Sequence, residues 1–340
     1  MKIVKVLVIL FVFISCQKEK NKKIDFIKAK KTITQIDKLT SDKEIENFIR
    51  KTDTNYSEFK LKNIQDFKRN KQDSLNRILA KQLQINVPFT KADFDNNGLT
   101  DLLAIGDNNK VKSYDDNGNE MSYDFTTIVL MNFKNGFKII DINKDRFNPI
   151  APKVEYDNNK PFLVNYSSRW VPNQKLNYHE KTRSKLTYKF DDFIEYNENP
   201  KKHVIEKIEY STEPCFGSCP VFKLEINKNR TAIFCAEKYN FSDEINQNPE
   251  KTDEGKFKTV ISEKEFNELI DILNYIDFST LQNSYWVYWT DDQRSELKIT
   301  FDNGKTKNIN DYGLIGTYGL KRTYEMLFNL RKNQNWEQIK

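Results

Sequence analysis

Three turn signals, each set between runs of alternating apolar and polar residues, restrict the fold of this chain most strongly. KNG at 134–136 separates FTTIVLMNF from FKIIDIN, DNG at 302–304 separates SELKITF from KTKNIND, and NKN at 227–229 joins VFKLEIN to TAIFCAEKY. Asn and Gly accept the left-handed backbone that a tight hairpin requires, so each signal predicts two antiparallel strands. Further strands are predicted at 57–64, 162–168, 185–196 and 203–211.

Helices are predicted from capping boxes and from apolar stripes. Ser41 is followed three residues later by Glu44, and Ser262 by Glu265, which is the pattern of a helix N-terminus. Leucines and isoleucines at helical spacing add two further helices. The four helices are expected at 42–51, 66–83, 263–276 and 318–333. The sequence therefore predicts an α+β protein of antiparallel β-sheets with a few packed helices.

The chain has 340 residues, enough for two hydrophobic cores. NENPKK at 197–202 is its most loop-like central stretch. The sequence therefore predicts four parts: a signal peptide (1–15), a lipidated cysteine with a flexible tether (16–38), an N-terminal α+β domain (39–198) and a C-terminal α+β domain (203–340).

The first sixteen residues, MKIVKVLVILFVFISC, indicate export and lipid attachment. Their apolar run from Val6 to Ile14 is shorter than the roughly 20 residues that span a bilayer, which is typical of a signal peptide. The ending Ser15-Cys16 resembles a bacterial lipobox, which implies that Cys16 is lipidated and anchors the protein in a membrane. Gln17, rather than an aspartate, favours an outer-membrane lipoprotein that faces either the periplasm or the cell surface.

Composition argues against a nucleic-acid partner and indicates no reaction. The net charge is +6, but lysine and arginine alternate with aspartate and glutamate and form no dense basic patch. The sequence has no G-x-S-x-G, H-E-x-x-H or Walker A motif. His179 and His203 are both expected to be exposed structural residues. We therefore expect a protein without catalytic activity.

An acidic loop, DFDNNGLTD at 93–101, carries oxygen-bearing side chains at alternate positions around a glycine. This spacing can wrap a hard cation, so we expect a structural Ca²⁺ ion. Its ligands would be the side chains of Asp93, Asp95, Asn97 and Asp101 and the carbonyl of Leu99. A hydrogen-bonded Asx turn without a metal is the alternative.

The acidic loop resembles two kinds of calcium-binding loop. It matches the first nine positions of an EF-hand, but Ala104 stands where the EF-hand has a bidentate glutamate. It is more similar to the turns of FG-GAP or VCBS-type repeats, which lie between strands, although the motif occurs once in this chain. The second resemblance implies a turn between two strands.

Three cysteines remain once Cys16 is assigned to lipid: Cys215, Cys219 and Cys235. Thiols outside the cytoplasm tend to be oxidised, and Gly217 permits a tight bend, so a Cys215–Cys219 disulfide is favoured. A bond from either cysteine to Cys235 is the other pairing.

CFGSCP also resembles the C-x-x-x-C-P motif of Sco-type copper chaperones, which implies copper binding. Those proteins use a histidine far downstream, whereas both histidines of this chain precede the motif. Thiol exchange is a third interpretation, although the cysteines precede a predicted strand and not a helix N-terminus that would activate a thiolate. Zinc is the fourth.

Residues 203–337 resemble an uncharacterised domain family of Bacteroidota lipoproteins whose signature is C-F-G-x-C-P-x-[YF]. CFGSCPVF at 215–222 carries this signature, and Phe222 takes the position usually held by tyrosine. The resemblance implies a fold unit without an assigned activity. It favours a structural disulfide at the cysteine pair.

The aromatic run YWVYW at 285–289 is expected to be a strand whose Tyr285, Val287 and Trp289 face the core. Trp286 and Tyr288 would then face outward and contact an unknown protein or glycan partner. The sequence as a whole favours a non-catalytic outer-membrane lipoprotein that acts as a binding or envelope-interaction module. The alternative is an envelope thiol-redox or copper-handling protein that uses the cysteine pair.

Overall fold

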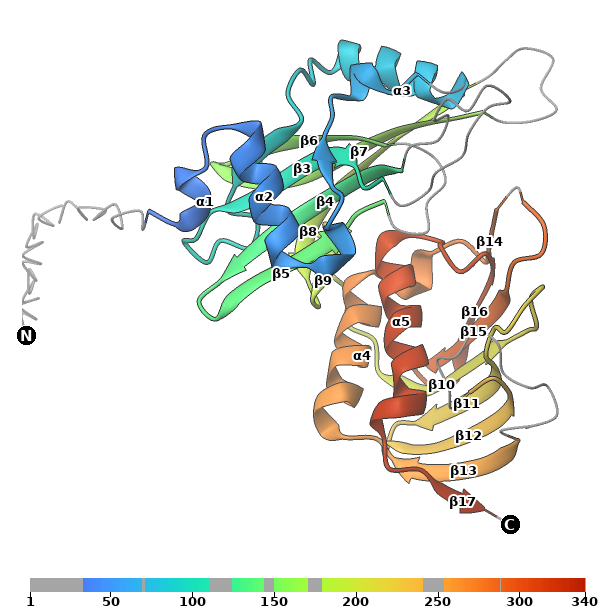
Figure 1. The fold of residues 1–340 in the computed structure, drawn as a ribbon. Coiled ribbons are helices and arrows are strands. Elements are labelled where there is room, and N and C mark those ends of the chain that lie inside the picture. The colour runs from blue at the N-terminus through green and yellow to red at the C-terminus, as the bar shows by residue number, and fades with distance from the viewer. Residues whose placement is uncertain are drawn as a thin grey trace, which may run out of the picture. The chain divides into compact units, whose positions relative to one another are not determined.

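A computed structural model describes residues 33–68, 71–109, 124–143, 150–170, 179–240, 254–287 and 289–339. Ile33–Lys340 form one compact unit that contains three β-sheets (Figure 1). The sheets are almost entirely antiparallel and carry helices, so the predicted α+β class is confirmed. The signal peptide, Cys16 and most of the tether lie outside the described residues.

The first sheet has five strands and is covered on both faces. Ile36, Ile45 and Ile49 from two helices pack on one face, and Leu163 and Leu186 from the second sheet pack on the other. This double burial explains why β3 and β4 are buried almost throughout and do not alternate between buried and exposed residues. The elements are α1 (Gln35–Lys38), α2 (Asp42–Thr52), β1 (Lys60–Leu61), β2 (Phe89–Ala92), β3 (Asp101–Asp107), β4 (Phe125–Phe133) and β5 (Gly136–Asp141).

The second sheet has four strands in the order β6-β7-β8-β9. Helix α3 (Lys71–Gln82) buries Leu79 and Ala80 together with Ala151 of β6. The strands are β6 (Ile150–Asp157), β7 (Lys160–Trp170), β8 (His179–Lys189) and β9 (Asp192–Glu195). Three short 3₁₀ turns complete the described chain: η1 (Thr54–Tyr56), η2 (Ile64–Asp66) and η3 (Phe278–Thr280).

The third sheet has eight strands in the order β14-β16-β15-β10-β11-β12-β13-β17. All neighbours are antiparallel except β14 and β16, which are parallel. The strands are β10 (Ile205–Thr212), β11 (Val221–Asn227), β12 (Thr231–Lys238), β13 (Gly255–Val260), β14 (Ser284–Trp286), β15 (Arg294–Phe301), β16 (Lys305–Tyr312) and β17 (Glu337–Ile339).

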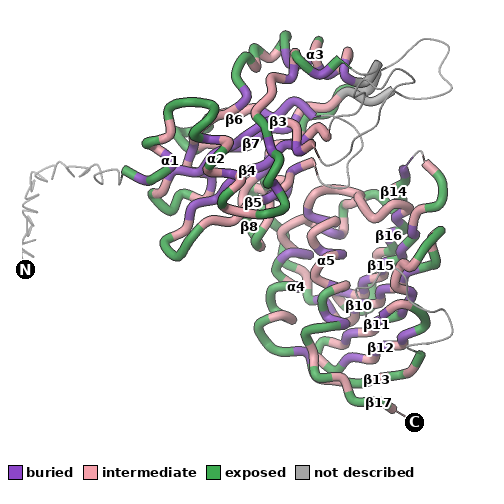
Figure 2. The backbone as a smooth tube through the Cα atoms, in the orientation of Figure 1, coloured by how far each residue is buried: buried purple, intermediate pink, exposed green. Residues whose placement is uncertain are grey.

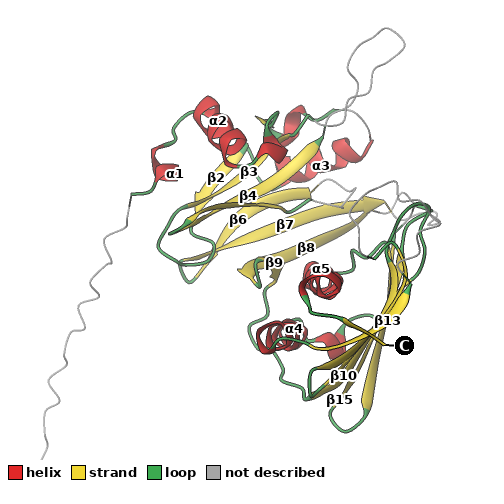
Figure 3. Ribbon diagram, turned by 60° about the horizontal axis from the view of Figure 1, so that its bottom comes forward, coloured by secondary structure: helices red, strands yellow, loops and turns green. Residues whose placement is uncertain are grey.

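Helices α4 (Glu263–Tyr275) and α5 (Tyr318–Asn333) lie side by side across one face of the eight-stranded sheet (Figures 1 and 3). Their leucines and isoleucines pack against alternate residues of the strands, such as Phe222, Leu224 and Ile226 of β11. The residues between them, Lys223 and Glu225, are not buried. Figure 2 shows buried segments, in purple, within the strands of this sheet. This sheet therefore shows the two-residue alternation of a strand with one covered face.

Helices 42–51 and 318–333 and the hairpins at 134–136, 227–229 and 302–304 are confirmed. Three other predictions are corrected. The strand expected at 57–64 shrinks to β1, and the helix expected at 66–83 begins only at Lys71. The strand expected at 185–196 is a hairpin, because Phe190 and Asp191 have φ of +55° and +65° and turn the chain.

Two points concern the predicted organisation of the chain. The tether expected at 16–38 ends in α1, whose Ile36 is fully buried in the core of the first sheet. The division near 197–202 stays a prediction, although the eight-stranded sheet begins only after it. Among the described helices, none combines the length and the apolar character needed to cross a lipid bilayer.

Candidate functional site

The acidic loop connects β2 to β3, so it lies between two strands. One carboxylate oxygen from each of Asp93, Asp95 and Asp101 lies within 4.8 Å of the others. Ala92 and Asp101 face each other as the last pair of the β2–β3 ladder, which brings the ends of the loop together. The three aspartates expected from the sequence therefore do converge.

Asp101 is the deepest of the three and is fully buried. Its Oδ2 accepts the backbone N–H of Phe94 at 2.8 Å, and its Oδ1 accepts that of Asn132 at 2.7 Å. Burial nevertheless raises the pKa of Asp101 to about 7, and the charges of Asp95 and Asp93 add to this. A cation at this place would offset the free-energy cost of keeping the buried Asp101 carboxylate ionised.

Backbone N–H groups of the loop also converge on the outer carboxylates. Asp93 accepts from Asn97 at 3.0 Å and from Gly98 at 2.9 Å. The Asn97 side-chain oxygen accepts the N–H of Leu99 at 2.7 Å. These bonds form the Asx turn that was the metal-free alternative. Each carboxylate oxygen has two lone pairs, so the same groups could also hold a cation.

The cysteine pair closes a short ring between β10 and β11. The Sγ atoms of Cys215 and Cys219 lie 1.91 Å apart, which is disulfide geometry, and their Cα atoms 5.8 Å apart. Gly217 inside the ring has φ of +149°, a conformation that favours glycine. The ring holds Phe216 outward with 89% of its surface exposed. Cys235 is a free, half-buried thiol on β12.

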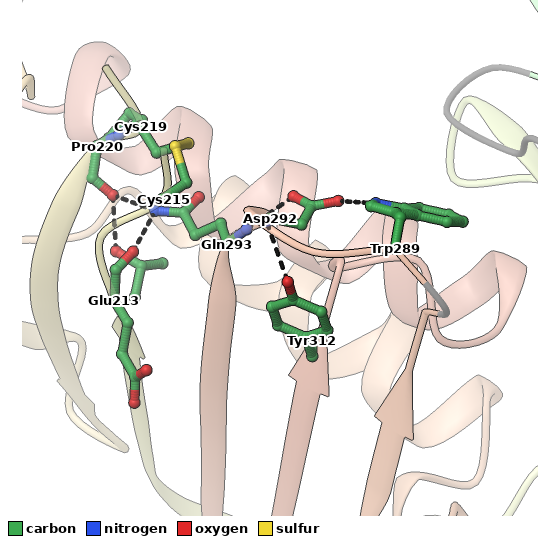
Figure 4. The surroundings of a disulfide bond; sticks show 9 residues. Glu213, Cys215, Cys219, Pro220, Trp289, Asp292, Gln293 and Tyr312 are labelled. Carbon is green, nitrogen blue, oxygen red and sulfur yellow. Dashed lines mark hydrogen bonds between the residues drawn. A yellow bond between two sulfur atoms is a disulfide. The ribbon is translucent and has the colours of Figure 1, made fainter. Parts of the chain in front are cut away.

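Gln293, immediately before β15, ties the disulfide ring to the neighbouring loop. Its Nε2 donates to the carbonyl of Glu213 at 2.9 Å and to that of Pro220 at 2.7 Å, on the two sides of the ring. The Phe216 N–H reaches the Asp291 carbonyl at 3.2 Å. Figure 4 shows Gln293 between the cysteines on one side and Asp292 and Trp289 on the other. The ring and the loop 289–293 therefore form one connected rim at this end of the sheet.

A cavity of about 650 Å³ lies at this rim, and we call it the Trp289 cavity. Its size is in the range of small-molecule sites. One wall is a face of α5, at positions three and four residues apart. The lining residues are Trp289, Asp292 and Gln293 from the loop, Gly313, Leu314 and Ile315 after β16, and Lys321, Tyr324, Glu325, Phe328 and Asn329 of α5.

The indole of Trp289 is held in a fixed orientation. Its Nε1 donates to Asp292 Oδ2 at 2.7 Å, and the backbone N–H of Asp292 donates to the Tyr312 hydroxyl at 3.1 Å. Gly313 and Val287 lie close together, and this approach requires a glycine because a Cβ at position 313 would lie 2.6 Å from the Val287 side chain. The cavity walls are thus set by packing and hydrogen bonds before any ligand arrives.

The strand expected at 285–289 is corrected, because β14 ends at Trp286. Trp289 consequently lines the cavity and does not continue the core face of a strand. Trp286 is 57% exposed, and it does not line the Trp289 cavity. Tyr288 lies outside the described residues.

A polar cluster lies in the core next to the cavity, and the sequence reasoning missed it. Tyr210, Ser295, Asp311 and Tyr324 are all at least 98% buried. The rings of Tyr210 and Tyr324 stack with centroids 5.6 Å apart. Burial, and then the charge of Asp311, raises the pKa of Tyr324. A signal existed: Ser295 and Asp311 occupy inward positions of β15 and β16 that alternation otherwise gives to apolar residues.

His203 is not the exposed residue that the sequence suggested. Its side chain is 16% exposed, packs against Phe278 and Phe301, and bonds Asp302 through Nδ1 at 2.6 Å. His203 precedes β10 and the cysteine pair follows β10. The length of this strand, at ~3.3 Å per residue, therefore separates His203 from the pair by about 25 Å. His203 therefore cannot complete a copper site with this pair. The side chain of His179 lies outside the described residues.

Comparison with known proteins covers part of the chain. Residues 206–331 match a domain of unknown function, DUF6438, which agrees with an uncharacterised C-terminal domain. The match includes the disulfide ring, the loop 289–293 and all cavity-lining residues. No curated protein and no solved structure was found to match the chain.

Proposed function

We propose that this protein is a non-catalytic binding module of the outer envelope, and that its ligand occupies the Trp289 cavity. The observation that carries the proposal is a preformed cavity with an oriented indole, beside the ring that bears the cysteine signature. Binding sites typically combine aromatic walls with a few placed polar groups.

The rim also favours binding over the alternative of thiol exchange. The cysteine pair precedes β11, so no helix N-terminus is present to lower the pKa of an attacking thiol. The same ring is fastened on both sides by Gln293, which lines the cavity. A structural ring that shapes the cavity edge accounts for both observations.

Native mass spectrometry of the full chain, purified from its own envelope in detergent, tests the proposal. A small molecule should copurify with the wild type and with Trp286→Ala, whose indole lies outside the cavity lining. Trp289→Ala should lose it. Retention of the same molecule by Trp289→Ala, or its absence from the wild type, would contradict binding in this cavity.

We also propose lipid attachment at Cys16 and an outer-membrane location facing the periplasm or the surface. The support is the order of apolar run, Ser15 and Cys16. Cys16→Ser should release unprocessed or soluble protein that incorporates no radiolabelled fatty acid. Labelling of that variant would overturn the assignment.

A structural Ca²⁺ ion in the acidic loop is a separate proposal. The convergence of Asp93, Asp95 and Asp101 supports it. Burial disfavours the ionised form of the Asp101 carboxylate, and a cation would stabilise that form. Asn97 and the carbonyl of Leu99 would complete the oxygen ligands. Calcium here would fix a turn in the first sheet and would not act at the Trp289 cavity.

A further inference from the structure

We infer that Glu195, at the end of β9, positions the α5 wall of the Trp289 cavity, and this inference rests on the proposed binding function. Five residues of α5 line the cavity. Glu195 contacts the first turn of the same helix. It precedes the segment 206–331 that matches the domain of unknown function. A residue outside the matched segment therefore acts on the cavity through α5.

The Glu195 carboxylate caps the start of α5. Its Oε1 accepts the backbone N–H of Tyr318 at 2.7 Å, and its Oε2 accepts that of Gly319 at 2.8 Å. These are the first two residues of α5, whose N–H groups have no acceptor within the helix. The internal cap, Thr317, accepts the N–H of Leu320 at 3.1 Å and leaves those two donors to Glu195. A carboxylate suits this place because the helix dipole puts partial positive charge at the N-terminus.

Two further bonds join α5 to the second sheet. Asn165 Nδ2 of β7 donates to the Tyr318 hydroxyl at 2.9 Å. Arg322 Nε donates to the Phe190 carbonyl, at the turn between β8 and β9, at 2.8 Å. The same guanidinium pairs with Glu325 at 3.1 Å, and Glu325 lines the cavity. The contact between the second sheet and α5 therefore continues to a cavity-lining side chain.

Gly319 lets α5 approach both of its neighbours closely. A Cβ at position 319 would lie 2.4 Å from the Ile276 side chain and 3.4 Å from Glu195 Oε2. Ile276 ends α4, so the start of α5 is held between α4 and β9. Because α5 and the loop 289–293 both line the cavity, a displacement of α5 changes the space between them. Glu195 is therefore a positioning residue and does not itself line the cavity.

Hydrogen exchange on the full chain in detergent tests this role without any ligand. In Glu195→Ala, the amides of the first two turns of α5 (318–325) should exchange about tenfold faster or more, because two bonds to a charged acceptor are lost. Glu195→Gln keeps one acceptor oxygen and should give an intermediate rate. Glu198→Ala changes an exposed glutamate in the loop after β9. It is the matched control and should exchange like the wild type.

Native mass spectrometry of the same variants connects α5 to the cavity. Glu195→Ala should keep about half or less of the small molecule that copurifies with the wild type, and Glu195→Gln should keep more. Ser262→Ala removes the side-chain cap of α4, a helix that contributes no residue to the cavity lining. It should lower the free energy of unfolding and keep the molecule.

The outcomes separate this inference from the proposed function. Wild-type exchange at 318–325 in Glu195→Ala, or faster exchange with full retention of the molecule, would overturn the role of Glu195. Loss of the molecule from Ser262→Ala as well would also overturn it, because a general loss of stability would then explain both results. If the wild type carries no molecule, the proposed function fails. Faster exchange of Glu195→Ala at the cavity-lining positions 321–325 would still support the placement of α5 by Glu195.

Discussion

The acidic loop of 93–101 and the disulfide ring of 215–219 are both short connections between antiparallel strands, but they are closed by different forces. In the acidic loop, backbone N–H groups converge on carboxylates, one of them fully buried. In the ring, one covalent bond joins the ends. The first closure should respond to pH and, under our calcium proposal, to cations, whereas the second should respond to the redox state. Each can therefore be opened by a treatment that leaves the other closed.

The largest effect should come from the proton of Asp101, whose pKa is raised from its ordinary value of 3.8 to about 7. The folded state holds this proton more tightly than the unfolded state, so this contribution to stability is full at low pH and is lost as the pH rises from about 4 to about 7. In chelator, the loss should reach up to ~4 kcal/mol, since one pKa unit corresponds to ~1.4 kcal/mol. Urea unfolding at several pH values measures it.

Asp101→Asn is the matched variant for that pH profile, because it keeps the size of the side chain and removes the titration. Its unfolding free energy should be nearly constant between pH 4 and 7 apart from changes at other groups. A wild-type slope that persists in the variant would show that Asp101 is not its source.

Calcium should produce the next largest effect. An ion that binds only the folded state adds about 2.7 kcal/mol at a hundredfold excess over its Kd. Melting in Ca²⁺ and in chelator should therefore separate clearly, and Asp93→Asn should reduce the difference. Identical melting curves in the two conditions would leave the metal-free Asx turn as the correct description.

Opening the disulfide ring should cost less. A ring of about five residues restricts the unfolded chain by only ~2 kcal/mol in the loop-entropy model. The Cys215→Ser/Cys219→Ser variant should still fold, with that loss of unfolding free energy and no change in its response to Ca²⁺. Cys235→Ser is the control and should leave stability nearly unchanged.

Removing the link between the ring and the cavity should have the smallest effect on stability. Gln293→Ala deletes two hydrogen bonds to carbonyl oxygens, and the Pro220 carbonyl keeps its bond from Thr212. We expect a loss of about 1 kcal/mol by urea unfolding. A loss of several kcal/mol would mean that Gln293 supports the domain core and not only the rim.

The sequence predicted elements well where local chemistry determines them. Gly136 and Asn303 with Gly304 take the left-handed backbone at two of the hairpin turns, and Ser41 caps α2 together with Glu44, as predicted. At the third turn the left-handed residue is Arg230 and not an asparagine. The hairpin at Phe190 and Asp191 was missed because Phe190 is not a turn residue and no glycine follows Asp191, although both residues adopt left-handed backbone.

The cavity was harder to predict because it depends on contacts between distant segments. The aromatic run was identified, but an assumed continuous strand assigned its outward face to Trp286 and Tyr288. Trp289 reaches the cavity only because the chain leaves the strand after Trp286 and Asp292 bonds the indole. Strand periodicity alone cannot predict where a three-residue edge strand ends.

The most direct test of our account asks whether the disulfide ring serves the cavity. Native mass spectrometry should compare the bound small molecule in the Cys215→Ser/Cys219→Ser variant and in Cys235→Ser, each purified as the full chain from its envelope. We predict that the double variant folds but loses most of its ligand, while Cys235→Ser keeps it. Wild-type ligand occupancy in the folded double variant would contradict the claim that the ring and the Trp289 cavity form one site.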